Sequence, residues 1–152
     1  MITEPDIILT DLCVTSKKHA LECVSAEICR HLGRRNGQCT EILERLIERE
    51  NIGSTAIGHG VAIPHIKLSN IDAPMGILVR LKTPVCFDAD DRQPIDLIYV
   101  FMVPEDAQQS SLIQLSRISG FFRNSEFRAR LRGDINLGQE FDLCNQELAA
   151  AA

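Results

Sequence analysis

The residues best suited to chemistry lie in the stretch Gly53–His65, which reads GSTAIGHGVAIPH. Its three glycines, at positions 53, 58 and 60, indicate a backbone that turns sharply or lies close to another group. The β-branched residues between and after them predict two very short extended segments rather than a helix. Pro64 fixes its own φ and pushes Ile63 towards an extended conformation. His65 therefore leaves a constrained backbone, and its imidazole is a candidate nucleophile.

The other three histidines are weaker candidates for chemistry. His19 and His31 fall within a helical pattern, where ordinary surface or boundary positions are the simplest interpretation. His59 lies between two glycines and could reach a site. His59 and His65 together would suit a metal-dependent hydrolase, but their spacing matches no zinc motif and no nearby carboxylate completes a site.

Apolar periodicity predicts two helices that precede this stretch. The first follows Ser16, which can cap it, and is expected to end at Asn36–Gly37. The second is expected to have Thr40 as its cap. Arg49 stands near the end of this second helix, four residues before the glycine-rich stretch.

Strands are predicted after His65. Residues 76–82 alternate as a strand with one wetter face, which Thr83–Pro84 is expected to end. Residues 95–103 are almost entirely apolar, as in a strand that is covered on both faces.

The last part of the chain is predicted to be helical. A helical stripe runs from Leu112 to Phe122, a short helix capped by Ser125 follows, and a last helix is expected over about 137–148. Two helices, a group of strands and further helices indicate an α/β fold with a mixed sheet. We expect a three-layer α/β/α sandwich in which helices cover the sheet on both faces.

Composition limits the size and the partners of the protein. A length of 152 residues predicts a single domain over residues 1–152. The net charge of −5 argues against nucleic acid or an anionic membrane as the main partner. No signal-peptide pattern opens the chain, and its longest apolar run is far shorter than the ~20 residues of a membrane helix. We therefore expect a cytoplasmic protein without membrane insertion. We also expect neither a cofactor nor a metal.

The six cysteines show no C-x-x-C pair and no regular spacing. A disulfide framework would need a secretory context, and a zinc site would need a different spacing. We expect reduced core or near-surface thiols at all six positions, which are Cys13, Cys23, Cys29, Cys39, Cys86 and Cys144.

The motif from Arg49 to His65, RENIGSTAIGHGVAIPH, resembles the signature of the enzyme IIA family of the phosphotransferase system, of the fructose, mannitol and nitrogen-regulatory type. The resemblance covers about residues 5–148. It continues through Phe87–Asp90, Gln93–Ile98, Val103–Glu105 and Leu112–Ser119. The single-domain length and the Gly-Ser-Thr sequence are most similar to those of the nitrogen-regulatory members.

The resemblance implies that His65 accepts a phosphoryl group from a phosphohistidine on a small HPr-like or NPr-like phosphocarrier protein. It also implies that the Arg49 guanidinium steadies the phosphoryl oxygens. A glycine-rich loop can bring backbone N–H groups close to such oxygens. The phosphate-binding loop is accordingly expected at Gly58, His59, Gly60 and Pro64. We expect Nε2 of His65 to attack while a backbone carbonyl holds the Nδ1–H.

The resemblance further implies regulation of target proteins, such as sensor kinases or transporters, in nitrogen or carbon metabolism or potassium homeostasis. Transient partners of this kind are expected to bury less than ~1,200 Å². An apolar collar around an exposed His65 would support such docking.

Ser111 departs from the family pattern, because members commonly carry a second histidine just before the Leu-x-x-Leu helix. A serine there can cap the helix or donate one hydrogen bond to the phosphate, but it cannot carry a positive charge. We therefore expect a phosphoryl form that is less well stabilised than in relatives, or tuned for regulation rather than flux. The alternative is a protein-binding module that keeps the fold and has lost efficient phosphotransfer.

Overall fold

The computed structural model describes residues 5–88, 92–107 and 109–133, without the side chains of residues 36–38 and 110. The last helix expected from the sequence, over about 137–148, lies outside the described residues. Among the described residues, no helix combines the length and the apolar character that a membrane span requires.

The described strands form one mixed six-stranded sheet in the order β1-β5-β6-β3-β2, with β4 also paired to β6. Their bounds are β1 Ile7–Leu12, β2 Ala56–Gly58, β3 Val61–Ala62, β4 His65–Leu68, β5 Met75–Val85 and β6 Ile95–Pro104. The β1–β5 pair is parallel, whereas β5 and β6 are antiparallel. Both β3 and β4 run parallel to β6, one after the other along the same edge. The expectation of a mixed sheet is confirmed.

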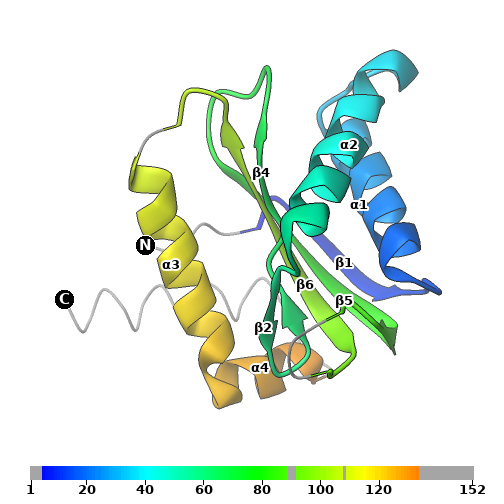
Figure 1. Cartoon of the computed structure of the whole chain (residues 1–152), viewed down its shortest axis with the longest axis vertical. Coiled ribbons are helices and arrows are strands. Elements are labelled where there is room, and N and C mark those ends of the chain that lie inside the picture. The colour runs from blue at the N-terminus through cyan, green and yellow to red at the C-terminus, as the bar shows by residue number, and fades with distance from the viewer. Residues whose placement is uncertain (1–4, 89–91, 108, 134–152) are drawn as a thin grey trace.

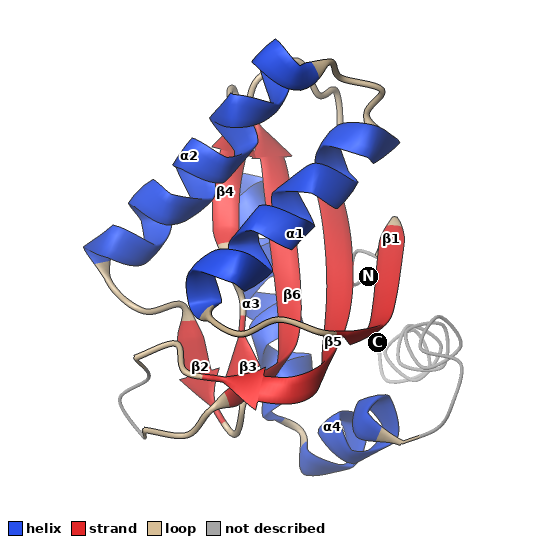
Figure 2. Ribbon diagram, turned by 90° about the vertical axis from the view of Figure 1, so that its right-hand side faces the viewer, coloured by secondary structure: helices blue, strands red, loops and turns tan. Residues whose placement is uncertain are grey.

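Helices cover both faces of this sheet (Figures 1 and 2). One face is covered by α1 (Lys17–His31) and α2 (Asn36–Ile52), and the other by α3 (Gln109–Arg123) and α4 (Ser125–Arg132). The predicted three-layer α/β/α arrangement is therefore confirmed.

Strand β6 is the centre of the core because its side chains supply both layers. Ile98, Val100 and Met102 pack on the α1 and α2 side, whereas Leu97 and Tyr99 pack on the α3 side. All of these side chains are 0% exposed, as expected for a strand covered on both faces.

The turn between α1 and α2 lies earlier than the sequence suggested. Ser16 caps α1 as predicted, and its Oγ accepts the His19 N–H at 3.1 Å. However, α1 ends at His31, and Gly33 adopts the left-handed φ of +67° that glycine tolerates best. Because α2 already begins at Asn36, the predicted break at Asn36–Gly37 and the predicted Thr40 cap are wrong.

Two further element ends differ from the prediction. Strand β5 continues through Thr83–Pro84 to Val85, where its register against β6 becomes irregular and a proline costs no regular ladder bond. The face of β5 that was predicted to be more exposed to solvent is exposed only in part, because Leu78 on this face is fully buried under α3. The cap of α4 is Asn124 and not Ser125, since Asn124 Oδ1 accepts the Phe127 N–H at 3.0 Å.

A disulfide joins Cys29 to Cys39, so the expectation of reduced thiols is wrong for these two residues. They are ten positions apart in the sequence, but the tight turn between α1 and α2 brings their Cα atoms to 5.5 Å. Within the described part of the chain, Cys13, Cys23 and Cys86 are free thiols, and Cys144 lies outside it.

Candidate functional site

The hairpin of β2 and β3 turns at Gly58-His59-Gly60, and all three residues have positive φ, at 98°, 58° and 77°. A side chain at Gly60 would meet Arg132 Nη2 at 2.7 Å and Asp96 Oδ1 at 3.0 Å. Arg132 donates to both Asp96 oxygens, at 2.9 and 2.8 Å, and to the His59 carbonyl. These glycines therefore serve the turn and its close contact with α4 and β6.

The register along β6 separates this turn from His65. Val61 lies opposite Leu97 and His65 opposite Phe101, which places His65 about 13 Å further along β6. His59 precedes Val61 and lies at the other end. The structure therefore does not bring the predicted phosphate-binding residues Gly58, His59 and Gly60 to the His65 ring.

The same separation removes the geometric support for a metal-dependent hydrolase that uses His59 and His65. Within the described ranges, no cluster of three His, Cys, Asp or Glu side chains could hold a metal ion.

His65 begins β4 and is half-buried, with its ring held at both nitrogens. Nδ1 lies 3.0 Å from the Ile63 carbonyl oxygen. A carbonyl can only accept a hydrogen bond, so Nδ1 carries the proton and Nε2 keeps its lone pair. Nε2 accepts the Nε–H of Arg49 at 3.3 Å. The carbonyl contact expected from the sequence is present, and attack by Nε2 stays a prediction.

Arg49 reaches this ring from the other side of the sheet. Ile66 and Leu68 point towards α1 and α2, so the alternating His65 and Lys67 point towards α3. Because β4 lies at an edge, under α2, the last turn of that helix can extend a side chain to the ring (Figure 2). Arg49 Nη1 also donates to the Gly53 carbonyl at 2.9 Å, which holds the guanidinium in place.

A buried carboxylate fixes the segment that follows α2. Glu50 is 7% exposed and accepts hydrogen bonds from the Thr55 hydroxyl and, at 3.4 Å, from Lys17 Nζ. Ser54 Oγ donates to the Phe87 carbonyl at 2.8 Å. These contacts hold residues 53–55 against the end of α2, next to Arg49.

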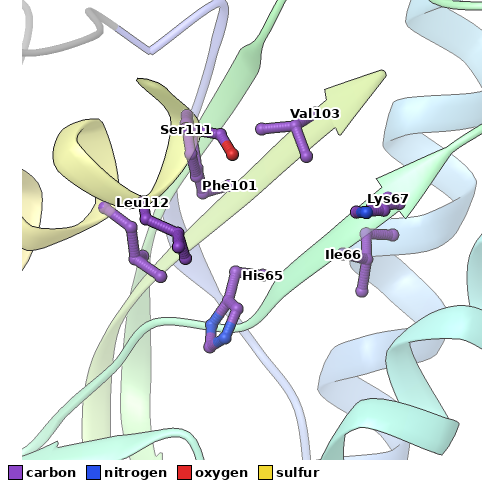
Figure 3. A pocket seen from close by; sticks show the side chains of 8 residues that line it. His65, Ile66, Lys67, Phe101, Val103, Ser111 and Leu112 are labelled. Atoms are coloured by element: carbon purple, nitrogen blue, oxygen red, sulfur yellow. The ribbon is translucent and has the colours of Figure 1, made fainter. Parts of the chain in front are cut away.

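Two small cavities meet at His65. One, of about 150 Å³, is lined by Arg49, Ser54, Thr55, Ala56, Ile57, Ile63, His65, Leu115 and Ser119. The other, of about 130 Å³, is lined by His65, Ile66, Lys67, Phe101, Val103, Ser111, Leu112 and Leu115 (Figure 3). The structure thus places Arg49 at one and Ser111 at the other of two cavities that share His65. Pro64 is buried, and its carbonyl accepts the Phe101 N–H at 2.8 Å.

Ser111 lies in the first turn of α3 and faces the cavity beside His65 (Figure 3). Because α3 already begins at Gln109, Ser111 is not the residue before the helix, and the helix-cap interpretation of Ser111 is wrong. A hydroxyl at this position lies in the same cavity as the imidazole.

Sequence reasoning missed other polar residues at the site. Ser119 lies one turn after Leu115 on the same face of α3, so the helical spacing that placed it in an apolar stripe also placed it at the cavity. Ser54 and Thr55 were part of the motif, but nothing local showed that they line the space next to Arg49.

Large apolar side chains are exposed on both sides of the site. Ile52 is 83% exposed at the end of α2, and Leu112 and Ile113 on α3 are 66% and 55% exposed. Exposed apolar side chains that flank a reactive group are typical of a surface that contacts another protein.

The chain is similar to known proteins over most of its length. Residues 1–142 match the family described as phosphoenolpyruvate-dependent sugar phosphotransferase system, EIIA 2. The nitrogen regulatory protein of Bradyrhizobium diazoefficiens is 37% identical over 131 residues, which cover 86% of this chain and 84% of that protein. The nitrogen regulatory protein of Pseudomonas aeruginosa is 40% identical over 117 residues, covering 77% and 75% of the two chains.

Solved structures show the same fold. The crystal structure of the nitrogen regulatory protein IIA-Ntr from Neisseria meningitidis is similar with a TM-score of 0.77 and 33% identity, over 89% of each chain. The mannitol IIA protein of Escherichia coli has a TM-score of 0.67 at 12% identity, over 90% of this chain and 94% of that one, which shows the fold alone. The chain therefore belongs to the EIIA 2 family of the phosphoenolpyruvate-dependent phosphotransferase system.

Proposed function

We propose that the chain is a phosphoryl-carrier protein whose acceptor is Nε2 of His65. This proposal rests on one observation: each of the two ring nitrogens of His65 has its own hydrogen-bond partner. The Ile63 carbonyl holds the Nδ1–H, and the lone pair of Nε2 faces the Arg49 guanidinium. Phosphoryl transfer needs positioning and electrostatic stabilisation more than covalent help from the protein, and this arrangement supplies both.

In the proposed step, Nε2 of His65 forms a bond to the phosphorus while the bond between phosphorus and the donor imidazole nitrogen breaks. The electron pair of the broken bond stays on the donor ring. The His65 ring becomes positively charged, and the Ile63 carbonyl stabilises its Nδ1–H. Arg49 is close enough to donate to the phosphoryl oxygens once its weak contact with Nε2 is lost.

The proposed donor is an HPr-like or NPr-like phosphocarrier protein that docks on the exposed apolar side chains around His65. Ile52, Leu112 and Ile113 offer this surface on α2 and α3. A fold neighbour supports docking of this kind: a solution structure from Escherichia coli contains enzyme IIA for mannitol in complex with phosphorylated enzyme IIB. We expect a small and transient interface, below ~1,200 Å².

The proposed role is regulatory, in a single cytoplasmic domain. Relatives with 37% and 40% identity are named nitrogen regulatory proteins. Target proteins would distinguish the phosphorylated from the unphosphorylated form, because the phosphoryl group adds negative charge between Ile52 and Leu112. Sensor kinases or transporters in nitrogen or carbon metabolism or potassium homeostasis are the proposed targets.

Incubation of the chain with enzyme I, a phosphocarrier and phosphoenolpyruvate tests the acceptor. We expect a mass gain of one phosphate that is absent in His65→Ala. The matched control is His59→Asn, because asparagine tolerates the left-handed φ at this position, and it should gain the phosphate normally. A phosphate that persists in His65→Ala would overturn the assignment. A parent protein that gains no phosphate would favour the alternative, a binding module that has lost phosphotransfer.

A further inference from the structure

A disulfide closes the α1–α2 corner, by which we mean residues 29–39. Cys29 lies in the last turn of α1 and Cys39 in the first turn of α2. Their Cα–Cα distance of 5.5 Å is within the range that a disulfide spans without backbone movement. The proposed phosphotransfer chemistry uses neither residue.

The backbone of this corner has its own hydrogen bonds. The Arg34 N–H donates to the Cys29 carbonyl at 3.0 Å and the Gly33 N–H to the Arg30 carbonyl at 3.1 Å, which is a Schellman-type helix end. The Arg34 carbonyl lies 3.5 Å from Cys29 Sγ and 3.9 Å from Cys39 Sγ. A backbone carbonyl that could accept from the thiols of the reduced form therefore lies next to the disulfide.

The two sulfur atoms differ in access. Cys29 is 3% exposed, whereas Cys39 is half-buried. A small thiol or disulfide in solution can therefore react at Cys39 first, and Cys29 is placed to resolve the intermediate.

The fold does not depend on this bond in the way that a small secreted domain does. A chain of 152 residues with a sheet covered on both faces buries enough surface to fold without a disulfide. In a reducing compartment, a disulfide is typically transient or redox-sensing. Only the location in a reducing compartment is taken from the proposed function.

The corner is connected to the strand that carries His65. The Arg34 guanidinium donates to the Ser69 carbonyl and, at 3.4 Å, to the Glu41 carboxylate. Glu41 in turn accepts the Ser69 hydroxyl at 2.8 and 2.7 Å. Ser69 directly follows β4, so the corner anchors the end of β4 opposite to His65.

We propose that Cys29 and Cys39, beside this anchor, form a reversible thiol–disulfide modification site with glutathione-class thiols and disulfides as co-reactants. In oxidation, the Cys39 thiolate attacks oxidised glutathione, and one glutathione thiolate leaves. The Cys29 thiolate then attacks Cys39 Sγ, and the bond to the second glutathione breaks. The two protein thiol protons pass to the two glutathione thiolates, and reduction reverses both steps.

The test equilibrates the full chain in mixtures of reduced and oxidised glutathione, followed by acid quench, alkylation and peptide mass mapping. In the oxidising mixtures we expect two fewer alkyl groups, both missing from the peptides with Cys29 and Cys39, and in the reducing mixtures full alkylation. The oxidised form should melt about 5–10 °C above the reduced form. Cys13→Ser and Cys86→Ser, which remove exposed free thiols, should keep this difference, and Cys39→Ser should abolish it.

Three results would overturn the proposal. Both cysteines could stay alkylated in every mixture, a glutathione adduct on Cys39 could persist without ring closure, or the disulfide could survive excess reduced glutathione in the native protein. The reduced parent is measured directly, so the test does not depend on whether a cysteine variant folds. Neither readout uses His65, so failure of the phosphotransfer assay would leave this result standing.

Discussion

The two ends of β4 are built in opposite ways. At its start, the His65 ring lies between two cavities and has one carbonyl and one guanidinium as its contacts. After its end, Ser69 is held by the Glu41 carboxylate and the Arg34 guanidinium, which also pair with each other. A four-residue strand therefore carries the proposed phosphoryl acceptor at one end and is held by a carboxylate and a guanidinium at the other.

The charges at these two ends are used differently. The Arg34 guanidinium donates hydrogen bonds to a carboxylate and a carbonyl, and its side chain is 9% exposed. In the described part of the chain, Arg49 contacts two neutral groups, Nε2 of His65 and the Gly53 carbonyl. Arg34 is therefore paired with a carboxylate at the Ser69 end, whereas the proposed function uses the charge of Arg49 to meet an arriving phosphoryl group.

Replacement of Arg49 should have the largest effect, and it should act on rate rather than on stability. We expect Arg49→Ala to slow phosphorylation of His65 about 10²–10³-fold, because the guanidinium would no longer meet the charge of the transferring group. Arg49→Lys should be intermediate, since it keeps the charge and loses the planar fork. The measurement is the initial rate of mass gain from a phosphorylated carrier protein.

The control for Arg49→Ala is Arg30→Ala, which removes an exposed arginine that pairs with Glu27 on α1. It should phosphorylate at the parent rate. An Arg49→Ala rate within about threefold of the parent, far from the size of a lost transition-state contact, would contradict the comparison.

Replacement of Arg34 should show the reverse pattern. Arg34→Ala leaves the Ser69 carbonyl and the Glu41 carboxylate without their buried partner, and we expect it to lower the free energy of unfolding by about 2–3 kcal/mol. Urea unfolding measures this loss. Arg30→Ala again serves as control, with a loss of at most about 0.5 kcal/mol for an exposed pair. If both variants lose the same free energy of unfolding, the contacts of Arg34 with Ser69 and Glu41 stabilise the fold no more than an exposed ion pair does.

Replacement of Ser111 by histidine should stabilise the phosphorylated form of His65. A second imidazole in the cavity beside His65 can carry a positive charge close to the phosphoryl group. We expect the phosphohistidine lifetime to increase about 3–10-fold, corresponding to roughly 1 kcal/mol. The lifetime is followed by intact mass after removal of the donor. Ser116→His, on an exposed position of α3, should leave it unchanged, and an equal gain there would point to a nonspecific effect.

The smallest effect concerns pH at the secured end. The Ser69 hydroxyl is the main cause that lowers the pKa of Glu41, with its backbone N–H and the Arg34 and Arg45 charges adding to it against desolvation. A carboxyl with a lowered folded-state pKa stabilises the fold fully above its unfolded pKa. This stability is lost as the pH falls through the folded pKa.

Ser69→Ala should therefore be less stable than the parent by about 1 kcal/mol at neutral pH. The difference should begin to shrink on acidification below the ordinary pKa of about 4.3 and vanish below the lowered folded-state pKa of Glu41. Urea unfolding of both proteins between pH 3 and pH 7 measures the change. A difference that stays constant over this range would show that the contact acts through packing and not through the ionised carboxylate.

Local patterns predicted much of the fold. The apolar runs predicted β6 as a strand covered on both faces, and Ser16 marked the start of α1. Short-range signals of this kind depend on a few neighbouring residues, so they can be read before the chain folds. Where two signals competed, as at Gly33 and Asn36–Gly37, the sequence did not show which glycine ends the helix.

The sequence by itself determined the chemistry that the chain can offer: an imidazole after a proline, an arginine before a glycine-rich stretch, and cysteines without a motif. The tertiary structure alone decided which of these groups meet. The register of β3 and β4 along β6 moved Gly58, His59 and Gly60 away from His65, and the end of α2 brought Arg49 to it. The physical reason is that such contacts depend on strand register and turn geometry, which join residues far apart in the chain and leave no local pattern.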